Sequence, residues 1–111
     1  MLKLKTSLCF EDVLLTPKYS DITSRSEIDT SVSLGKNINL GVPFISAPMD
    51  TVTGPRMATA MAQSGGLGII HRYNTIEEQV NLVNSAIKRL SRNESRIVGA
   101  AIGVTGDYIE R

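Results

Sequence analysis

One short apolar run, residues 42–45, stops abruptly at the segment Ser46-Ala-Pro-Met-Asp-Thr51. A helix is expected next, because Pro55 suits a first helical turn, where its missing N–H costs nothing. A second apolar strand, 67–70, then ends at His71. Buried strands that stop on functional side chains, each before a helix, are how an α/β barrel builds its active-site mouth. The order of strand, helix and strand therefore predicts a parallel α/β fold.

Capping residues mark the ends of two expected helices. Thr53 is placed to cap the first helix, and Gly65 stops it before a tight entry into the second strand. Thr75-Ile-Glu-Glu78 has the spacing of a capping box. Apolar residues at 76, 80, 83 and 87 then recur at helical spacing. We expect a second helix of about four turns.

The remaining C-terminal residues predict a third strand and the start of another helix. Residues 97–102 form a continuous apolar run, as in parallel strands that are buried on both faces. Asp107 and Glu110 repeat the capping-box spacing, and the sequence ends at Arg111. Since a complete (β/α)8 barrel needs about 250 residues, the 111 residues are expected to be one part of a longer enzyme.

The N-terminal residues predict a separate element. Apolar and polar residues alternate over 28–34 and again over 38–42, on both sides of the turn sequence Gly35-Lys-Asn37. This pattern indicates a β-hairpin with one buried face, which would plug one end of a barrel. We therefore expect two parts, an N-terminal segment with the hairpin (1–43) and the first βα units of an incomplete TIM barrel (44–111).

Composition excludes several classes of protein. A net charge of +1, with 21% charged residues, gives no electrostatic reason to expect nucleic acid or a membrane as a partner. The apolar runs fall well short of the roughly 20 residues that span a bilayer. The single cysteine, Cys9, permits no internal disulfide and suits a reducing compartment. We expect a cytoplasmic location.

The side chains at the two strand ends suggest a binding site. Small residues such as Ala47 let a ligand approach the backbone, Met49 offers an adaptable surface for a flat base, and Asp50 is an acceptor for a hydroxyl. A Met in the barrel core and an Asp that caps its loop remain the alternative at this stage. His71 could equally be a strand-end residue satisfied by the backbone. One histidine without grouped carboxylates predicts no metal site.

Four segments resemble the N-terminal part of the IMP dehydrogenase/GMP reductase family. They are Phe10-Glu-Asp-Val-Leu-Leu15, Ser46-Ala-Pro-Met-Asp-Thr-Val-Thr53, Met61-Ala-Gln-Ser-Gly-Gly-Leu-Gly-Ile-Ile-His71 and Val98-Gly-Ala-Ala-Ile-Gly-Val104. The resemblance implies a TIM barrel that binds a purine nucleotide, with Ala47 and Met49 near the base and Asp50 beside them. It implies a cofactor-side edge at His71 and Arg72. It favours the ligand role of the segment after the first strand over its alternative, whereas both roles of His71 stay open.

The resemblance also implies an activity. An IMP dehydrogenase oxidises IMP to XMP with NAD through a cysteine thioimidate, and the family expectations include K+ and a homotetramer. The family's catalytic cysteine lies in a later loop, so we expect no catalytic residue here, no role for Cys9 in catalysis, and an inactive isolated chain. The missing remainder of the barrel is therefore an expected partner.

Two other functions remain open from the sequence. GMP reductase shares the fold and the thiolate and uses NADPH. The short bridge 88–97, where many dehydrogenases insert a pair of CBS modules, and Gly54, where they usually have Glu, favour the reductase. Ser46-Ala-Pro-Met49 favours a dehydrogenase without that insert. The third possibility is a fragment that only binds or assembles with a partner segment.

Overall fold

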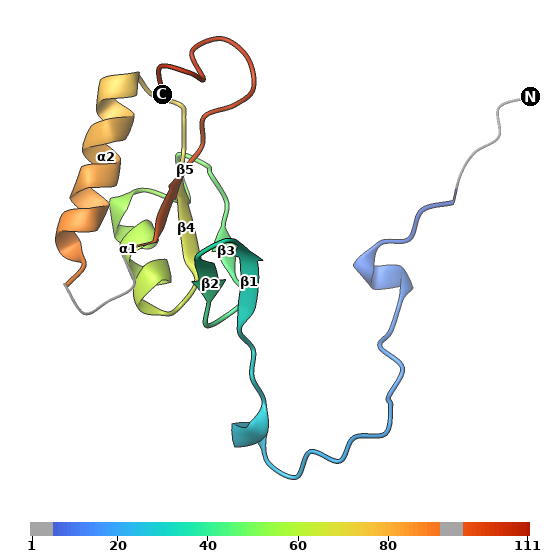
Figure 1. Cartoon of the computed structure of the whole chain (residues 1–111). Coiled ribbons are helices and arrows are strands. Elements are labelled where there is room, and N and C mark those ends of the chain that lie inside the picture. The colour runs from blue at the N-terminus through green and yellow to red at the C-terminus, as the bar shows by residue number, and fades with distance from the viewer. Residues whose placement is uncertain (1–5, 92–96) are drawn as a thin grey trace, which may run out of the picture.

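The computed structural model describes residues 6–91 and 97–111, and its centre is a three-stranded parallel sheet (Figure 1). The strand order is β3-β4-β5, which is also the order along the chain. Two helices connect the strands, and the five elements are β3 (Ile45–Ser46), α1 (Pro55–Gln63), β4 (Leu67–Ile70), α2 (Ile76–Arg89) and β5 (Val98–Ala100).

Both helices cover the same face of this sheet (Figure 1). α1 packs on β3, β4 and β5, and α2 packs on β4, β5 and α1. Right-handed βαβ units that keep adding strands in one direction must place every helix on one side, whereas a doubly wound sheet reverses its strand order. The arrangement confirms the α/β fold expected from the sequence and matches three consecutive strands of a TIM barrel.

The core between helices and sheet is made of small and branched side chains. Ala58 of α1, Ile70 of β4 and Ala86 of α2 are fully buried, and Leu82, Val83 and Val98 pack around them. Both helices present an alanine to the sheet, so their backbones can approach it closely.

α1 starts one residue later than the capping prediction requires. Gly54 is the N-cap, whereas Thr53 is completely buried and its hydroxyl is used elsewhere. The helix end is as predicted. Gly65 has a φ of 83°, and the N–H groups of Gly65 and Gly66 donate to the carbonyls of Ala62 and Met61 at 3.1 and 2.8 Å. This is the Schellman pattern, which uses glycine for the left-handed position.

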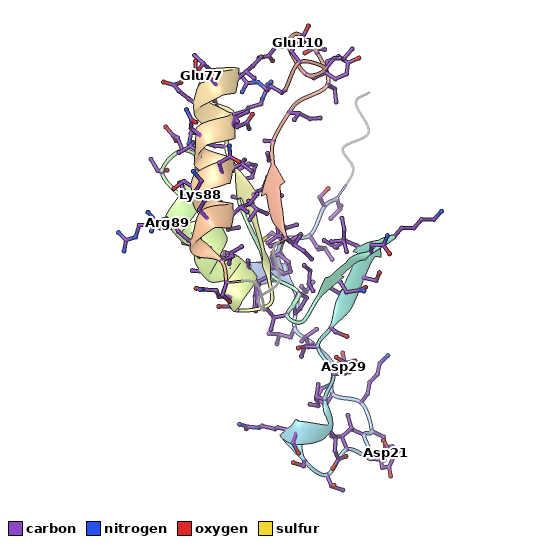
Figure 2. All side chains as sticks on the ribbon, turned by 60° about the vertical axis from the view of Figure 1, so that its left-hand side comes forward. Asp21, Asp29, Glu77, Lys88, Arg89 and Glu110 are labelled. Atoms are coloured by element: carbon purple, nitrogen blue, oxygen red, sulfur yellow. The ribbon has the colours of Figure 1, made fainter. Side chains whose placement is uncertain are left out.

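α2 begins with the predicted capping box. The Thr75 hydroxyl accepts from the Glu78 N–H at 3.2 Å, and the Glu78 carboxylate accepts from the Thr75 N–H at 2.8 Å. Glu77 lies near this N-terminus, with Lys88 and Arg89 at the opposite end (Figure 2). These charges complement the helix dipole.

The predicted helix of about four turns is confirmed, but part of its apolar stripe is exposed. Gln79 and Ala86 are the buried residues of the helix, whereas Val80 is 49% exposed. Val80 borders an open hollow beside Val83, Ala100 and Arg111, beyond the last strand of the sheet. A helix of a βα barrel contacts a neighbour on each side, and in the described part of the chain α2 has a helical neighbour only on the α1 side.

The N-terminal hairpin forms, but its predicted buried face does not. β1 (Val32–Gly35) pairs antiparallel with β2 (Ile38–Leu40), and Asn37 takes the left-handed conformation that its turn requires. Leu40 is buried, whereas the apolar residues of β1 and the start of β2 are 37–47% exposed. Little of the described chain packs against them.

The residues before the hairpin run away from the sheet and helices (Figure 1). They contain two short 3₁₀ turns, η1 (Phe10–Asp12) and η2 (Arg25–Glu27). The radius of gyration is 18.6 Å, against about 13 Å for a compact domain of this size. Among residues 6–91 and 97–111, no helix is long and apolar enough to cross a membrane. The bridge 88–97 lies partly outside the described residues.

Candidate functional site

The carboxyl ends of β3, β4 and β5 lie at one edge of the sheet, because the three strands are parallel. The segments that follow them contain every residue proposed for the site from the sequence. Figure 1 shows the last of these segments, after β5, beside the start of α2. In α/β barrels this is the edge at which ligands bind.

The segment after β3 is held in shape by Thr53. The Thr53 hydroxyl donates to the Ala47 carbonyl at 2.5 Å and lies 2.9 Å from the Ser46 hydroxyl. The Thr53 N–H donates to the Met49 carbonyl at 2.9 Å, and the Met49 N–H donates to the Ala47 carbonyl at 2.8 Å. A buried side chain thus joins both ends of the loop.

Although Thr53 is buried, the predicted ligand residues of the same loop are exposed. Ala47, Met49 and Asp50 are all exposed, and the Met49 side chain is 49% exposed. Little of the described chain packs on Met49, so its ligand role and the alternative of a place in the barrel core both stay predictions. The capping alternative for Asp50 has partial support, because its carboxylate accepts from the Thr51 N–H at 2.9 Å. An open hollow of about 490 Å³ lies between Asp50 and the first turn of α1.

His71 and Arg72 follow directly after β4. The His71 Nδ1 atom is buried and has no hydrogen-bond partner in the described residues, and the same holds for Asn74 Nδ2. Buried polar atoms are normally satisfied by protein, water or a ligand. Both residues border a hollow of about 420 Å³, although these two atoms are themselves closed off from it.

Arg72 reaches from the end of β4 to the segment after β5. A Cβ built on Gly103 would lie 2.6 Å from Arg72 Nη1, so the guanidinium occupies the space that a side chain would need. Gly103 also has a φ of 80°, which favours glycine. The Arg72 guanidinium at the end of β4 can therefore lie against the segment after β5 because residue 103 has no side chain.

Two residues of this edge, Gln79 and Arg111, had no role in the sequence analysis. Gln79 is 4% exposed and donates to the carbonyls of His71 and Ala101. Arg111 donates to Gln79 and Asn74. A polar residue on the core face of α2 was the one available signal for Gln79. The Asp107 carboxylate pairs with Arg111 at 2.8 Å. The Asp107 carbonyl accepts from the Arg111 N–H at 3.0 Å, as at the predicted helix start.

The described residues contain no group of three or more His, Cys, Asp and Glu side chains that could hold a metal ion, and we assign none. Cys9 is exposed, and its thiol donates to the Asp12 carboxylate at 3.1 Å in the N-terminal extension. The backbone N–H of Cys9, and next its thiol, hold the pKa of Asp12 below its ordinary value.

Comparison with curated proteins identifies relatives of known name. The chain is 58% identical over 82 residues to the inosine-5'-monophosphate dehydrogenase of Nitrosopumilus maritimus (strain SCM1). The aligned residues are 74% of this chain and 17% of that relative. It is 45% identical over 94 residues to the enzyme of the same name from Staphylococcus saprophyticus. These residues are 85% of this chain and 18% of that relative. The chain thus spans less than a fifth of the length of these relatives.

Solved structures give the same result for the fold. The GMP reductase of Trypanosoma brucei in complex with guanosine 5'-triphosphate aligns with a TM-score of 0.69 and 45% identity, over 72% of this chain and 19% of that one. A cysteine-to-alanine variant of the same enzyme in complex with guanosine 5'-monophosphate aligns with a TM-score of 0.73 and 43% identity. This alignment covers 79% of this chain and 18% of that one. The family model described as "IMP dehydrogenase / GMP reductase domain" matches residues 7–111, so this chain belongs to the IMP dehydrogenase/GMP reductase family.

Proposed function

We propose that this chain is the N-terminal part of an IMP dehydrogenase, which oxidises IMP to XMP with NAD. The observation that carries the proposal is the segment Ser46-Ala-Pro-Met-Asp-Thr-Val-Thr53, which Thr53 anchors at the carboxyl end of β3 with its small and apolar side chains exposed. The dehydrogenases at 58% and 45% identity support it.

In this proposal the β3–α1 loop binds the purine nucleotide. The exposed Met49 side chain is a polarizable surface on which a flat purine ring can lie, and Ala47 is small enough to let the ring approach the backbone. Asp50 has a carboxylate to accept a hydrogen bond from a ribose hydroxyl. The hydrogen bonds of Thr53 hold Ala47 and Met49 before the ligand arrives, which lowers the entropic cost of binding.

His71 and Arg72 would form part of the nicotinamide-cofactor edge. His71 and Asn74 border a hollow of about 420 Å³ with polar residues around it, which suits a ligand with amide and hydroxyl groups, and NAD carries both. Bound NAD supplies the hydride acceptor. The nucleophilic cysteine of the reaction lies outside these 111 residues, so the segment binds and orients without forming the covalent bond. Potassium, the homotetramer and a cytoplasmic location stay predictions.

GMP reductase is the second candidate, and a specific observation favours it. The solved structures that match the chain at TM-scores of 0.69 and 0.73 are GMP reductases, and Gly54 is at the position where dehydrogenases usually have Glu. The two reactions use related nucleotides on one fold, so the segment alone supports both. A non-catalytic assembly role is the third candidate, in which the segment binds the remaining strands of a barrel without turnover.

Two parallel assays distinguish these functions. The full-length protein that contains this segment is given IMP with NAD in one assay and GMP with NADPH in the other, and absorbance of the reduced nicotinamide is followed. The proposal expects reduction of NAD with IMP and no consumption of NADPH with GMP. Ammonia release from GMP, with no activity on IMP, would assign the reductase.

A further inference from the structure

A buried glutamine on α2 connects the ends of two strands. Gln79 is 4% exposed, and its Nε2 donates to the carbonyl of His71 at 3.1 Å and to the carbonyl of Ala101 at 2.8 Å. One carbonyl follows β4 and the other follows β5. A single amide group thus sets the spacing between the two segments.

Arg111 connects the same amide to one further residue in each of these two segments. Its Nη1 donates to Gln79 Oε1 at 3.0 Å, its Nη2 donates to the Asn74 carbonyl at 2.7 Å, and its Nε donates to Asp107 Oδ2 at 2.8 Å. The Arg111 side chain is only 8% exposed. Planar guanidinium groups suit several fixed acceptors at once. We call Gln79 and Arg111 together the Gln79–Arg111 clasp.

The clasp holds the backbone next to Arg72 and next to Gly103. The residue before Arg72, His71, and the residue two before Gly103, Ala101, are the two whose carbonyls Gln79 holds. A shift of either segment would separate the Arg72 guanidinium from the space above Gly103. The Gln79 amide donates twice and accepts once, so it is buried with its hydrogen bonds made and can hold both segments without the cost of an unsatisfied polar group.

We propose that Gln79 and Arg111 are positioning residues, which fix the two segments after β4 and β5 for binding of the nicotinamide cofactor. The inference rests on the proposed function and extends it to residues that do not touch substrate. The nucleotide loop after β3 is anchored separately by Thr53. The clasp therefore affects the cofactor and leaves binding of the purine nucleotide nearly unchanged.

The sharpest variant of the full-length enzyme is Gln79→Glu. It keeps the oxygen that accepts from Arg111, but it places a second carboxylate oxygen against two carbonyl oxygens in place of the amide donor. Asn39→Asp makes the same chemical change at an exposed position of the N-terminal hairpin. We expect Gln79→Glu to raise the KM for NAD by about tenfold to a hundredfold, and the KM for IMP by less than about twofold. Asn39→Asp should change neither.

Arg111→Lys and Arg111→Met extend the test if Gln79→Glu does not fold. Lysine keeps the charge but cannot contact all the acceptors, so its KM for NAD should lie between those of wild type and Arg111→Met. Equal increases in both KM values, or unchanged KM values in variants with a lowered melting temperature, would overturn the positioning role. A wild-type enzyme that uses only GMP and NADPH would instead refute the proposed function, and the same comparison would then be made with those two substrates.

Discussion

Ala58 of α1 occupies the space that a side chain at Gly68 of β4 would need. A Cβ built on Gly68 would lie 2.9 Å from the Ala58 Cβ and closer still to its Cα. Ala58 is fully buried, and the helix touches the strand backbone at this point. The first helix can therefore pack closely on the sheet only because one residue has no side chain and the other has a methyl group.

Gly68→Ala should destabilise the full-length protein by about 1–3 kcal/mol, because the added methyl forces the helix away from the strand. Denaturant unfolding of the variant and the wild type measures the difference. Gly54→Ser is the control, since a Cβ there meets no atom within 4 Å and serine is a good N-cap. A Gly68→Ala protein as stable as wild type would show that the helix does not pack this closely.

Thr53→Val should weaken nucleotide binding as well as stability. The variant keeps the shape of the side chain but removes the donor to the Ala47 carbonyl, at a cost of about 1–3 kcal/mol. Thr59→Val is the matched control, because Thr59 is also buried and its hydroxyl donates to the Pro55 carbonyl, within α1. Both variants should lose stability in thermal unfolding, and only Thr53→Val should raise the KM for IMP. An equal rise in both would contradict the anchoring of the loop.

Met49→Ala should raise the KM for IMP by about tenfold while the melting temperature stays nearly constant. The side chain is 49% exposed, so its removal leaves little cavity, and one well-packed ring contact is worth about 1.4 kcal/mol or tenfold. Steady-state kinetics and a thermal melt test the two halves. Cys9→Ser serves as the control, and its turnover should match wild type. A Met49→Ala enzyme with unchanged KM would remove the residue from the purine site.

The capping box of α2 should make stability depend on pH. The backbone N–H of Thr75, and next its hydroxyl, hold the pKa of Glu78 below its ordinary value of 4.5. A lowered folded pKa means that the stabilisation is fully present above the unfolded value and is lost as pH falls through the folded one. The stability difference between wild type and Glu78→Gln should thus be constant near neutral pH and shrink below about pH 4.5. Urea unfolding across that range measures it, and a difference independent of pH would argue against the capping box.

Local patterns in the sequence predicted the local structure well. Strand β4, the capping box at Thr75 and the helix stop at Gly65 depend on residues close together in the chain, and each is confirmed. The interactions that determine these three features lie within one helical turn or one strand. The family resemblance and the barrel-like order of strands also followed from such segments.

Features that depend on distant contacts could not be predicted. Thr53 satisfies the ordinary preferences of an N-cap, but the loop turns its hydroxyl inward to the Ala47 carbonyl. The Gln79–Arg111 hydrogen bond joins residues 32 positions apart, and no sequence period signals it. The exposed face of β1 shows that alternation identifies a strand, whereas burial requires something to cover it.

The central claim is that the carboxyl end of β3 binds the purine nucleotide, and a crystal structure of the full-length protein with IMP tests it most directly. The account predicts the purine ring in van der Waals contact with Met49, with the Ala47 backbone beside it and the hydrogen bond from Thr53 to Ala47 intact. A nucleotide bound away from residues 46–53, with Met49 covered by protein, would contradict it.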